Sequence, residues 1–310
     1  MHILITGGAG FIGSNIADAY LKEKHKVFII DDLYSGRLSN VPKDAKYVQM
    51  DLRDNDLERL FKNFKIDFVN HQAARGDVRG SLERPREYAS VNVEGGINLL
   101  ECCRKNNVKG VIYSSTGGCV YGEPIYTPSD ELHPIQPRDP YGASKASFET
   151  YLHMYKELYN LNYTIFRYPN VYGPRQNPQG EAGVISIFTK LMLDNKDIII
   201  NGDGTQERDF VFVKDIVNAN LIGTKTPANT VLNLGTGIGT NVNQIFAILK
   251  EITNYSKLPK YGPKKNGEVQ RSILNSLKAE LLWNWKYKVS IEEGLKTTVE
   301  YIRQNEKDNK

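Results

Sequence analysis

Short apolar runs alternate with longer segments of helical period along the first half of the chain. We expect strands over residues 3–5, 27–30, 47–48, 68–69, 111–113 and 163–166, and helices over residues 11–21, 57–64, 93–103 and 141–158. The strands are apolar at consecutive positions, as strands buried on both faces are. Strands and helices in this order predict an α/β fold of the Rossmann type, a doubly wound parallel sheet with helices on both faces.

The pattern changes near Pro169, after which loops rich in proline, glycine and asparagine separate shorter elements. Helices are expected here over residues 184–193, 242–252 and 291–303. We therefore expect residues 1–169 to form the Rossmann domain and residues 170–303 to form mainly a smaller C-terminal α/β lobe. Segments 215–222 and 231–234 are candidates to return to the first domain, and the polar tail 304–310 should fray.

Composition limits the class of protein without naming a function. The 310 residues are 40% hydrophobic and 25% charged, with a mean hydropathy of −0.45, as in globular proteins. With no apolar stretch near the roughly 18 residues of a membrane span and no signal-peptide core, we expect a cytoplasmic protein without membrane contact. The net charge of +4 is too small to indicate a nucleic-acid partner. The three cysteines and five histidines lack ligand spacing and predict no metal site.

A glycine-rich turn follows the first expected strand and opens the first helix, with Gly7, Gly10 and Gly13 three residues apart. The first glycine permits a tight turn, the second lets the backbone approach a pyrophosphate, and the third lets the helix pack against the strand. The unpaired N–H groups and the dipole at the start of the helix favour the same anion. The alternative is a glycine-rich turn that binds no ligand. An acidic residue near the second strand argues against this alternative.

That acid is Asp31, which directly follows the second expected strand and stands 18 residues after Gly13. In dinucleotide-binding folds a carboxylate here accepts hydrogen bonds from the ribose of an adenosine, and it repels the 2′-phosphate of NADP, so the expected cofactor is NAD. Asp51 follows the third strand, where it could meet the adenine amino group. Its alternative role is to cap the helix that starts near Asp54, which Asp54 could also do.

A tyrosine and a lysine, Tyr141 and Lys145, lie four residues apart at the start of the helix expected over 141–158, and so share one face. A phenol with its usual pKa of about 10 is a poor base, but a nearby ammonium, the helix N-terminus and a positive nicotinamide ring each favour its anion. Tyr141 is thus a candidate general base, and a hydroxyl of Ser115 or Thr116 is a candidate partner for the same substrate oxygen. The structural alternative is a tyrosine that starts a helix and a lysine in solvent.

Taken together, these motifs resemble those of the extended short-chain dehydrogenase/reductase superfamily and, within it, the UDP-glucose (UDP-galactose) 4-epimerases. The resemblance covers nearly the whole chain, up to about Tyr301. It rests on residues 6–13, 31–36, 71–74, 91–93, 115–122, 141–145, 167–175, 202–204 and 208–210.

The resemblance implies an NAD-dependent isomerase that interconverts UDP-glucose and UDP-galactose. The sugar would be oxidised at C4 to a 4-keto intermediate and take the hydride back on its other face, so that the cofactor need not leave. Tyr141 would be the acid and base on the 4-hydroxyl, Lys145 would hold the nicotinamide ribose and lower the pKa of the tyrosine, and Thr116 would bridge to the 4-oxygen.

Further residues are implied to bind cofactor or substrate. The implied cofactor-binding residues are Gly7, Gly10, Phe11, Ile12, Gly13, Asp31, Asp32, Ser35, Gly36, Asp51, Leu52, Gln72, Ala73, Ala74, Asn92, Ser114, Tyr141, Lys145 and Tyr168. The implied substrate-binding residues are Thr116, Asn170, Gly183, Val184, Asn201, Arg208, Lys265, Arg271 and Ser272. Asn92 would also support the helix that carries Tyr141. The implied partners are a nucleotide sugar and a second copy of the chain, packed through segments 93–103 and 141–158, whose apolar residues could equally be core.

Two glycines, Gly117 and Gly118, follow Thr116 where related dehydratases carry an Asp-Glu pair and related decarboxylases typically keep a glutamate. Without a carboxylate there, a 4-keto intermediate has only the return hydride open to it. This absence favours an epimerase over a lyase. The other readings are an oxidoreductase that shares the first step and a non-catalytic NAD-binding regulator, which predicts a damaged Tyr-Lys pair.

Several positions depart from the family pattern. Arg75 and Asp77 bring two unexplained charges into the stretch before Val78, and Leu282 interrupts the usual Leu-Gly-Trp. Lys265 replaces an arginine on the diphosphate, so that Arg271 is a candidate contributor. Asn201 replaces an aromatic residue near the uracil. Ser272 corresponds to a gate beside the sugar, and its small side chain predicts acceptance of UDP-N-acetylglucosamine and UDP-N-acetylgalactosamine; alternatively, Ser272 lies in a loop away from the substrate.

Overall fold

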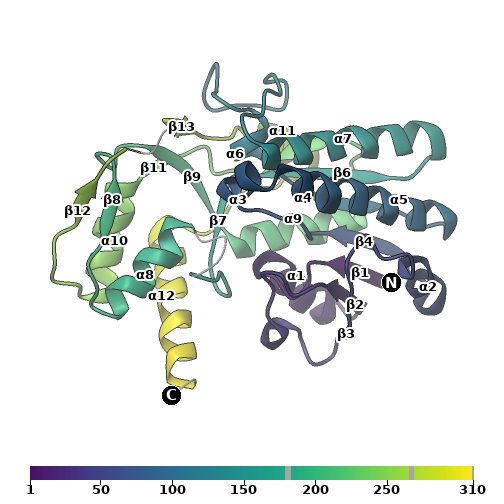
Figure 1. The fold of residues 1–310 in the computed structure, drawn as a ribbon, viewed down its shortest axis with the longest axis horizontal. Coiled ribbons are helices and arrows are strands. Elements are labelled where there is room, and N and C mark those ends of the chain that lie inside the picture. Colours follow the sequence, from purple (N-terminus) through teal and green to yellow (C-terminus); the bar gives the residue numbers. More distant parts are fainter. Residues whose placement is uncertain (179–182, 265–268, 309–310) are drawn as a thin grey trace. The chain divides into compact units, whose positions relative to one another are not determined.

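The computed structural model describes residues 1–178, 183–264 and 269–308, and the chain divides into two compact units (Figure 1). Unit 1 comprises Met1–Gly122, Pro134–Tyr168 and Val217–Asn233. Unit 2 comprises Glu123–His133, Pro169–Ile216 and Leu234–Lys310. Residues 123–133 belong to unit 2, whereas the sequence analysis expects them in the first domain.

A seven-stranded sheet forms the centre of unit 1, in the order β10-β6-β5-β4-β1-β2-β3 with every neighbouring pair parallel. The strands are β1 (His2–Thr6), β2 (Lys26–Asp31), β3 (Lys46–Gln49), β4 (Phe68–His71), β5 (Val111–Thr116), β6 (Tyr163–Tyr168) and β10 (Val231–Asn233). The chain runs outward in one direction from β1 and in the other from β4. This confirms the doubly wound parallel fold and puts its switch point, where such sheets bind ligands, at the carboxyl ends of β1 and β4.

Helices cover both faces of this sheet. The helical elements of unit 1 are α1 (Phe11–Lys22), a short 3-10 turn (Leu38–Asn40), α2 (Leu57–Phe64), α3 (Val78–Glu83), α4 (Pro85–Ala89), a π-helical segment (Ser90–Glu94), α5 (Gly95–Lys105), α6 (Gly117–Val120), α7 (Pro140–Tyr159) and most of α9 (Val213–Lys225). Helices α2, α5 and α7 pack on one face of the sheet, with Leu99, Leu100, Cys102 and Cys103 of α5 in the core. Four apolar residues of α5 are therefore core residues, whereas Ile97 of the same helix is half-buried.

Unit 2 has a small four-stranded sheet and its own core. The sheet consists of β7 (Asn170–Tyr172), β9 (Glu207–Phe212), β11 (Gly239–Asn241) and β13 (Arg271–Ser272), and β8 (Ile199–Asn201) pairs with β12 (Lys260–Gly262). The helices are α8 (Val184–Leu193), α10 (Val242–Thr253), α11 (Leu277–Trp283) and α12 (Ile291–Asp308). Helices α8, α10 and α12 pack around Ile185, Phe188, Phe246, Leu249 and Leu295. Helix α12 continues to Asp308, beyond the expected bound of residue 303 and into the segment for which fraying is expected.

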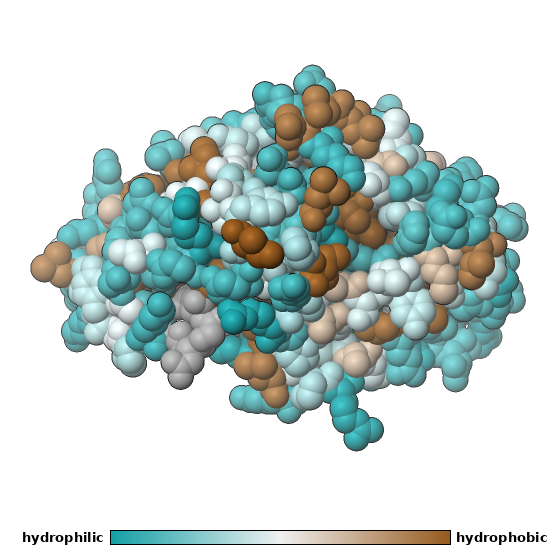
Figure 2. Space-filling model, turned by 90° about the horizontal axis from the view of Figure 1, so that it is seen from above, coloured by the Kyte–Doolittle hydropathy of each residue, from teal (hydrophilic) through white to brown (hydrophobic). Residues whose placement is uncertain are grey.

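The surface mixes polar and apolar side chains. The face in Figure 2 is mostly hydrophilic, with apolar side chains gathered in separate small patches. Within the described ranges, none of the helices combines the length and the apolar character that a transmembrane span requires.

Candidate active site

The glycine-rich turn forms a cradle at the carboxyl end of β1. Gly7 has a φ of +67°, and a Cβ on Gly13 would collide with the carbonyl oxygen of Gly7, so neither position tolerates a side chain. Gly10 precedes α1 in an extended conformation, no side chain caps the helix, and its first turn has no acidic residue. The N–H groups of Phe11, Ile12 and Gly13 have no partner within the helix. The cradle thus fits a pyrophosphate.

The carboxylate of Asp31 lies beside this cradle. It accepts hydrogen bonds from the N–H groups of Ala9 at 3.0 Å and Leu33 at 2.8 Å. Burial raises the pKa of Asp31, and these two donors oppose the rise. A carboxylate oxygen can accept more than one hydrogen bond, so Asp31 still has acceptor capacity for a ribose. Gly36 packs against this carboxylate, since a Cβ there would lie 2.7 Å from Oδ1, whereas Ser35 is exposed.

Two other acids at this edge are held by arginines. Asp32 forms an ion pair with Arg75 at 2.9 Å. Asp51 accepts from Arg53 at 2.6 Å, and this contact lowers the pKa of Asp51. The residue preceding α2 is Asp56, so neither Asp51 nor Asp54 stands at the cap of that helix. Leu52, another expected cofactor residue, is buried in the hydrophobic core.

The segment after β4 runs alongside the glycine cradle. A Cβ built on Gly7 would lie 2.7 Å from the Ala73 nitrogen, and Ala74 follows on the same half-buried stretch. The Gln72 amide donates to Asn70 at 2.6 Å. His71 is fully buried, its Nδ1 lies 2.7 Å from the Thr6 hydroxyl, and burial lowers its pKa to about 3. His71 is therefore neutral and structural rather than an acid or base at pH 7.

The hydroxyls at the end of β5 point in different directions because successive strand residues face opposite sides. Ser115 is buried and donates to the Glu149 carboxylate, so its hydroxyl is already occupied. Ser114 is also buried and donates to the His71 carbonyl at 3.1 Å. Thr116 is half-buried, and its hydroxyl makes no capping bond to α6. The geometry therefore favours Thr116 over Ser115 as the hydroxyl that contacts the substrate oxygen.

The Tyr-Lys pair lies on the first two turns of α7. Asp139 caps this helix by accepting from the Gly142 N–H at 2.7 Å, and Pro140 fixes its first turn. Lys145 is 3% exposed, which contradicts the alternative of a lysine in solvent. Its Nζ donates to the Ser114 carbonyl at 2.7 Å and lies 6.0 Å from the centre of the half-buried Tyr141 ring. The cation is thus fixed between the end of β5 and the candidate base.

Asn92 connects the segment after β4 to α7. Its Oδ1 accepts from the Arg75 N–H at 2.8 Å, and its Nδ2 donates to the Arg75 carbonyl at 3.0 Å and to Ser144 at 2.9 Å. Ser144 in turn donates to the Tyr141 carbonyl at 2.7 Å. These contacts engage the Asn92 amide with the protein and stabilise the turn that carries the candidate base.

A buried ion pair behind the site went unnoticed in the sequence. Arg167 donates to Glu149 through two nitrogens and to the Tyr121 hydroxyl at 2.9 Å, and both charged side chains are buried. Glu149 stands one helical turn after Lys145 on the same face of α7. A carboxylate in the middle of a buried helix face was the signal that could have revealed it.

Tyr168 lies beside Thr116 in the β5–β6 register and is buried. Its hydroxyl accepts from Asn220 at 3.0 Å, and burial raises its pKa. Asn220 was also missed, since it lies on α9, more than fifty residues further along the chain.

The substrate residues expected from the family lie in unit 2, except for Thr116. Arg208 on β9 and Ser272 on β13 are register partners, and Ser272 is buried. Arg271 is more exposed and pairs with Glu207 at 2.6 Å. The other described members are the exposed Asn170 on β7, Gly183 and Val184 at the start of α8, and Asn201 at the end of β8, while Lys265 lies outside the described residues.

Asp209, next to Arg208, is a further residue that sequence analysis did not single out. Its buried carboxylate accepts from the N–H groups of Thr236, Gly237 and Leu274 and from the Thr236 hydroxyl. Burial raises the pKa of Asp209, and these donors oppose the rise. The residue anchors the loop after β10 to the strand that carries Arg208.

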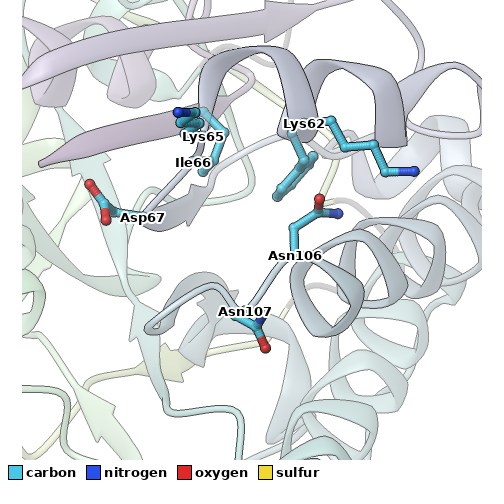
Figure 3. A pocket seen from close by; sticks show the side chains of 7 residues that line it. Lys62, Lys65, Ile66, Asp67, Asn106 and Asn107 are labelled. Carbon is cyan, nitrogen blue, oxygen red and sulfur yellow. The ribbon is translucent and has the colours of Figure 1, made fainter.

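A hollow of about 270 Å³ lies elsewhere in unit 1, at the amino ends of the strands (Figure 3). It is lined by Phe61, Lys62, Lys65, Ile66, Asp67, Asn106 and Asn107. None of the residues expected in the site contributes to it. It is not the candidate active site, which occupies the carboxyl edge of the sheet.

A doubly wound parallel sheet with a glycine cradle after β1 and an acid at the end of β2 is typical of dinucleotide-binding proteins, and a Tyr-Lys pair such as that on α7 is typical of short-chain dehydrogenases. The profile of the NAD dependent epimerase/dehydratase family matches residues 3–235, and the chain belongs to this family. NAD is its cofactor, and it is an isomerase-type enzyme similar to UDP-glucose 4-epimerases.

The relatives are similar over their whole length. A solved UDP-glucose 4-epimerase of Thermotoga maritima with UDP-glucose is 46% identical, with 98% of this chain and 99% of that chain covered and a TM-score of 0.97. One from Thermus thermophilus in complex with NAD is 39% identical, with the same coverage and a TM-score of 0.92. The UDP-glucose 4-epimerase of Mycolicibacterium smegmatis is 38% identical, over 98% of this chain and 99% of its own. The matches also include mammalian dTDP-D-glucose 4,6-dehydratases and a UDP-N-acetylglucosamine 4-epimerase of Methanobrevibacter ruminantium.

Proposed function

We propose that this protein interconverts UDP-glucose and UDP-galactose by reversible oxidation at C4. The observation that carries the proposal is the combination at the end of β5. Thr116 is followed by two glycines instead of acids, and the buried Lys145 ammonium stands next to the Tyr141 ring. This set of groups can move the proton of a hydroxyl but offers no side-chain base for an elimination.

In the proposed reaction, three residues have separate roles. Tyr141 takes the proton of the C4 hydroxyl and returns it, and Thr116 holds the same oxygen. Lys145, fixed by the Ser114 carbonyl, favours the anionic form of the phenol. Bound NAD supplies the reversible oxidation of a secondary alcohol. Its pyrophosphate would lie on the glycine cradle and its adenosine ribose at Asp31.

A dehydratase is the competing function, because dehydratases occur among the relatives. Gly117 and Gly118 argue against it, and the Glu149 carboxylate is committed to Arg167 and Ser115. The intact Tyr-Lys pair argues against a non-catalytic regulator.

The substrate range and the nucleotide are finer parts of the proposal. Arg208 and Asn170 are proposed to bind the nucleoside diphosphate, with Arg271 contributing charge. Ser272 is proposed as the gate for the 2-substituent, so that UDP-N-acetylhexosamines are accepted as well. The short side chain of Ser272 on β13, next to Arg208, supports this assignment.

The test is to incubate the purified protein, without added NAD, with UDP-glucose, UDP-galactose and their N-acetylated forms and to identify the products. Epimers alone are expected. Products that have lost water would identify a dehydratase, and accumulation of reduced cofactor in the ultraviolet spectrum would identify an oxidoreductase. Either result would contradict the proposal.

The gate has its own test. Ser272→Tyr should lower the turnover of the N-acetylated sugars about tenfold or more relative to the plain sugars, because the larger ring fills the space for the acetamido group. The plain sugars measured with the same variant are the internal control. An unchanged ratio would remove Ser272 from the proposal.

A further inference from the structure

A buried arginine connects three segments around the loop that follows β2. Arg75 is 8% exposed, and it donates to Asp32 at 2.9 Å and to Glu87 of α4 at 3.0 Å. Its guanidinium lies 3.7 Å from the centre of the Tyr34 ring. Arg84 strengthens the cluster from outside by donating to Glu87 and to the Tyr34 hydroxyl, both at 2.9 Å. The charge at position 75, unexplained in the sequence, therefore has two carboxylate partners.

The loop that Arg75 holds encloses the carboxylate of Asp31. Leu33 adopts a left-handed conformation with φ of +60°, which a leucine disfavours, and in doing so directs its N–H to Asp31. Gly36 closes on the same carboxylate from the far end of the loop. A disfavoured backbone persists only where its surroundings hold it. The contacts of Arg75 with Asp32 and Tyr34, on either side of Leu33, supply such a restraint.

The backbone of Arg75 has a separate task. Its N–H and carbonyl both bind Asn92, which in turn binds Ser144 below Tyr141. The side chain of Arg75 thus serves the loop around Asp31, while its backbone supports the helix of the candidate base. A side-chain substitution can separate the two.

We propose that the Arg75 side chain is a positioning residue that keeps the loop of residues 31–36 closed around the adenosine end of NAD and so retains the cofactor between turnovers. The inference rests on the proposed function, in which NAD is restored in each cycle and has no need to leave. Opening this loop would expose the Asp31 carboxylate and loosen its contact with the ribose. The predicted consequence is faster loss of NAD with little change in the chemical step.

The test compares wild type, Arg75→Gln and the matched control Arg86→Gln, which removes an exposed arginine from the same helix as Glu87. Each protein is desalted, its NAD is released by denaturation and quantified, and the NAD-depleted form is titrated with NAD by calorimetry. For Arg75→Gln we expect NAD well below one per chain and a dissociation constant at least about tenfold higher, as for loss of one charged partner. Its kcat with excess NAD should fall less than about threefold, and Arg86→Gln should match wild type.

The outcomes separate the inference from the proposed function. If wild type binds NAD and epimerises sugars while Arg75→Gln keeps wild-type affinity, the inference is wrong and the function stands. A lower melting temperature and kcat at unchanged NAD affinity would also overturn the inference, since that is a structural effect. If the wild-type protein binds no NAD, both the inference about Arg75 and the proposed function are wrong. Should Arg75→Gln not fold, Glu87→Gln, which removes the other carboxylate partner of Arg75 and leaves the Arg75–Asp32 pair intact, must raise the NAD dissociation constant in the same direction. Unchanged NAD binding in that variant would overturn the inference.

Discussion

The proposed chemistry depends on how two side chains on α7, Tyr141 and Lys145, are fixed. Tyr141 and Lys145 could be found from spacing alone, but the partners that hold them could not. The Ser114 carbonyl and the Asn92 amide reach α7 from segments more than twenty-five residues away. Sequence spacing identifies neighbours on one helix face, whereas the contacts that fix them depend on tertiary packing.

Removing the phenol oxygen should stop the reaction without disturbing the fold. Tyr141→Phe deletes the proposed base, and loss of general acid–base catalysis lowers turnover by about 10² to 10⁴. NAD should remain bound, because the ring and Lys145 stay in place. Product formation and NAD content of the purified variant are the measurements, with Tyr159→Phe, at the exposed end of α7, as the control. Retained activity would mean that the base is misassigned.

His71 makes the stability of the protein sensitive to acid. Its folded pKa of about 3 lies below the usual 6.5, so only the unfolded chain takes up a proton as the pH falls through this range. The contribution is present in full above pH 6.5 and is lost progressively down to about pH 3, on the order of 5 kcal/mol in total.

The free energy of unfolding of wild type and His71→Asn, measured between pH 7 and pH 4, checks this. Asparagine keeps a hydrogen-bonding group toward Thr6 but does not titrate, so the variant should lose stability less steeply. His153→Gln, which removes an exposed histidine from α7, should keep the wild-type slope. Equal slopes for wild type and His71→Asn would contradict the prediction.

At the scale of elements, the strongly periodic segments were predicted well. Helices α2 and α8 have the expected bounds, and α1, α7 and α10 differ from expectation by one or two residues. The missed strands are two to six residues long and owe their structure to distant partners. β13 consists of Arg271 and Ser272 alone, and it exists because it pairs with residues 207–208. No local pattern carries that information.

The ends of elements depend on neighbours in the same way. Residues 304–308 read as a polar tail, yet α12 continues through them. The charges of Arg75 and Asp77 were likewise unexplained until their partners were known, Asp77 being the cap of α3. Leu282 lies half-exposed on α11, and nothing in the structure explains its choice.

The Glu149–Arg167 pair stabilises three elements at once, because it connects β5, α7 and β6 behind the reactive edge. Glu149→Gln leaves a buried guanidinium without its counter-charge, which costs about 3 to 5 kcal/mol. Chemical denaturation should show this loss. Glu58→Gln, which breaks the exposed pairs with Lys62 and Lys105, should lower the free energy of unfolding much less, because solvent screens these pairs. Similar losses for the two variants would show that burial does not decide the effect.

At the scale of the whole molecule, the fold class followed from element order, but the division into units did not follow from the chain alone. Residues 217–233 return to unit 1 through α9 and β10, as the sequence suggested for part of this stretch. Residues 123–133 leave it, and their pairing with Leu274 lies far along the chain. The expected site residues are divided in the same way, with the reactive groups in unit 1 and the nucleotide-sugar set in unit 2.

The proposed homodimer is tested at this scale. Most apolar residues of α5 are core, and the more exposed apolar side chains on the two expected helices are Met154, Leu158 and Tyr159 of α7, which are the candidates for an interface. We expect light scattering to give about twice the chain mass of 35.1 kDa. Leu158→Glu should reduce the mass to that of one chain, because it puts a charge into the contact. A wild-type monomer would rule out the dimer, and a Leu158→Glu dimer would rule out this contact.

The burial of two of the three cysteines bears on how this enzyme can be observed. Desolvation raises the pKa of the Cys102 thiol to about 11 and that of Cys103 well above its usual range, so neither forms a reactive thiolate near neutral pH. Cys119 is only half-buried, on the short helix α6 that begins directly after Thr116. A maleimide dye should therefore attach there first, which gives the unaltered sequence its own attachment point for a fluorescent reporter of sugar binding.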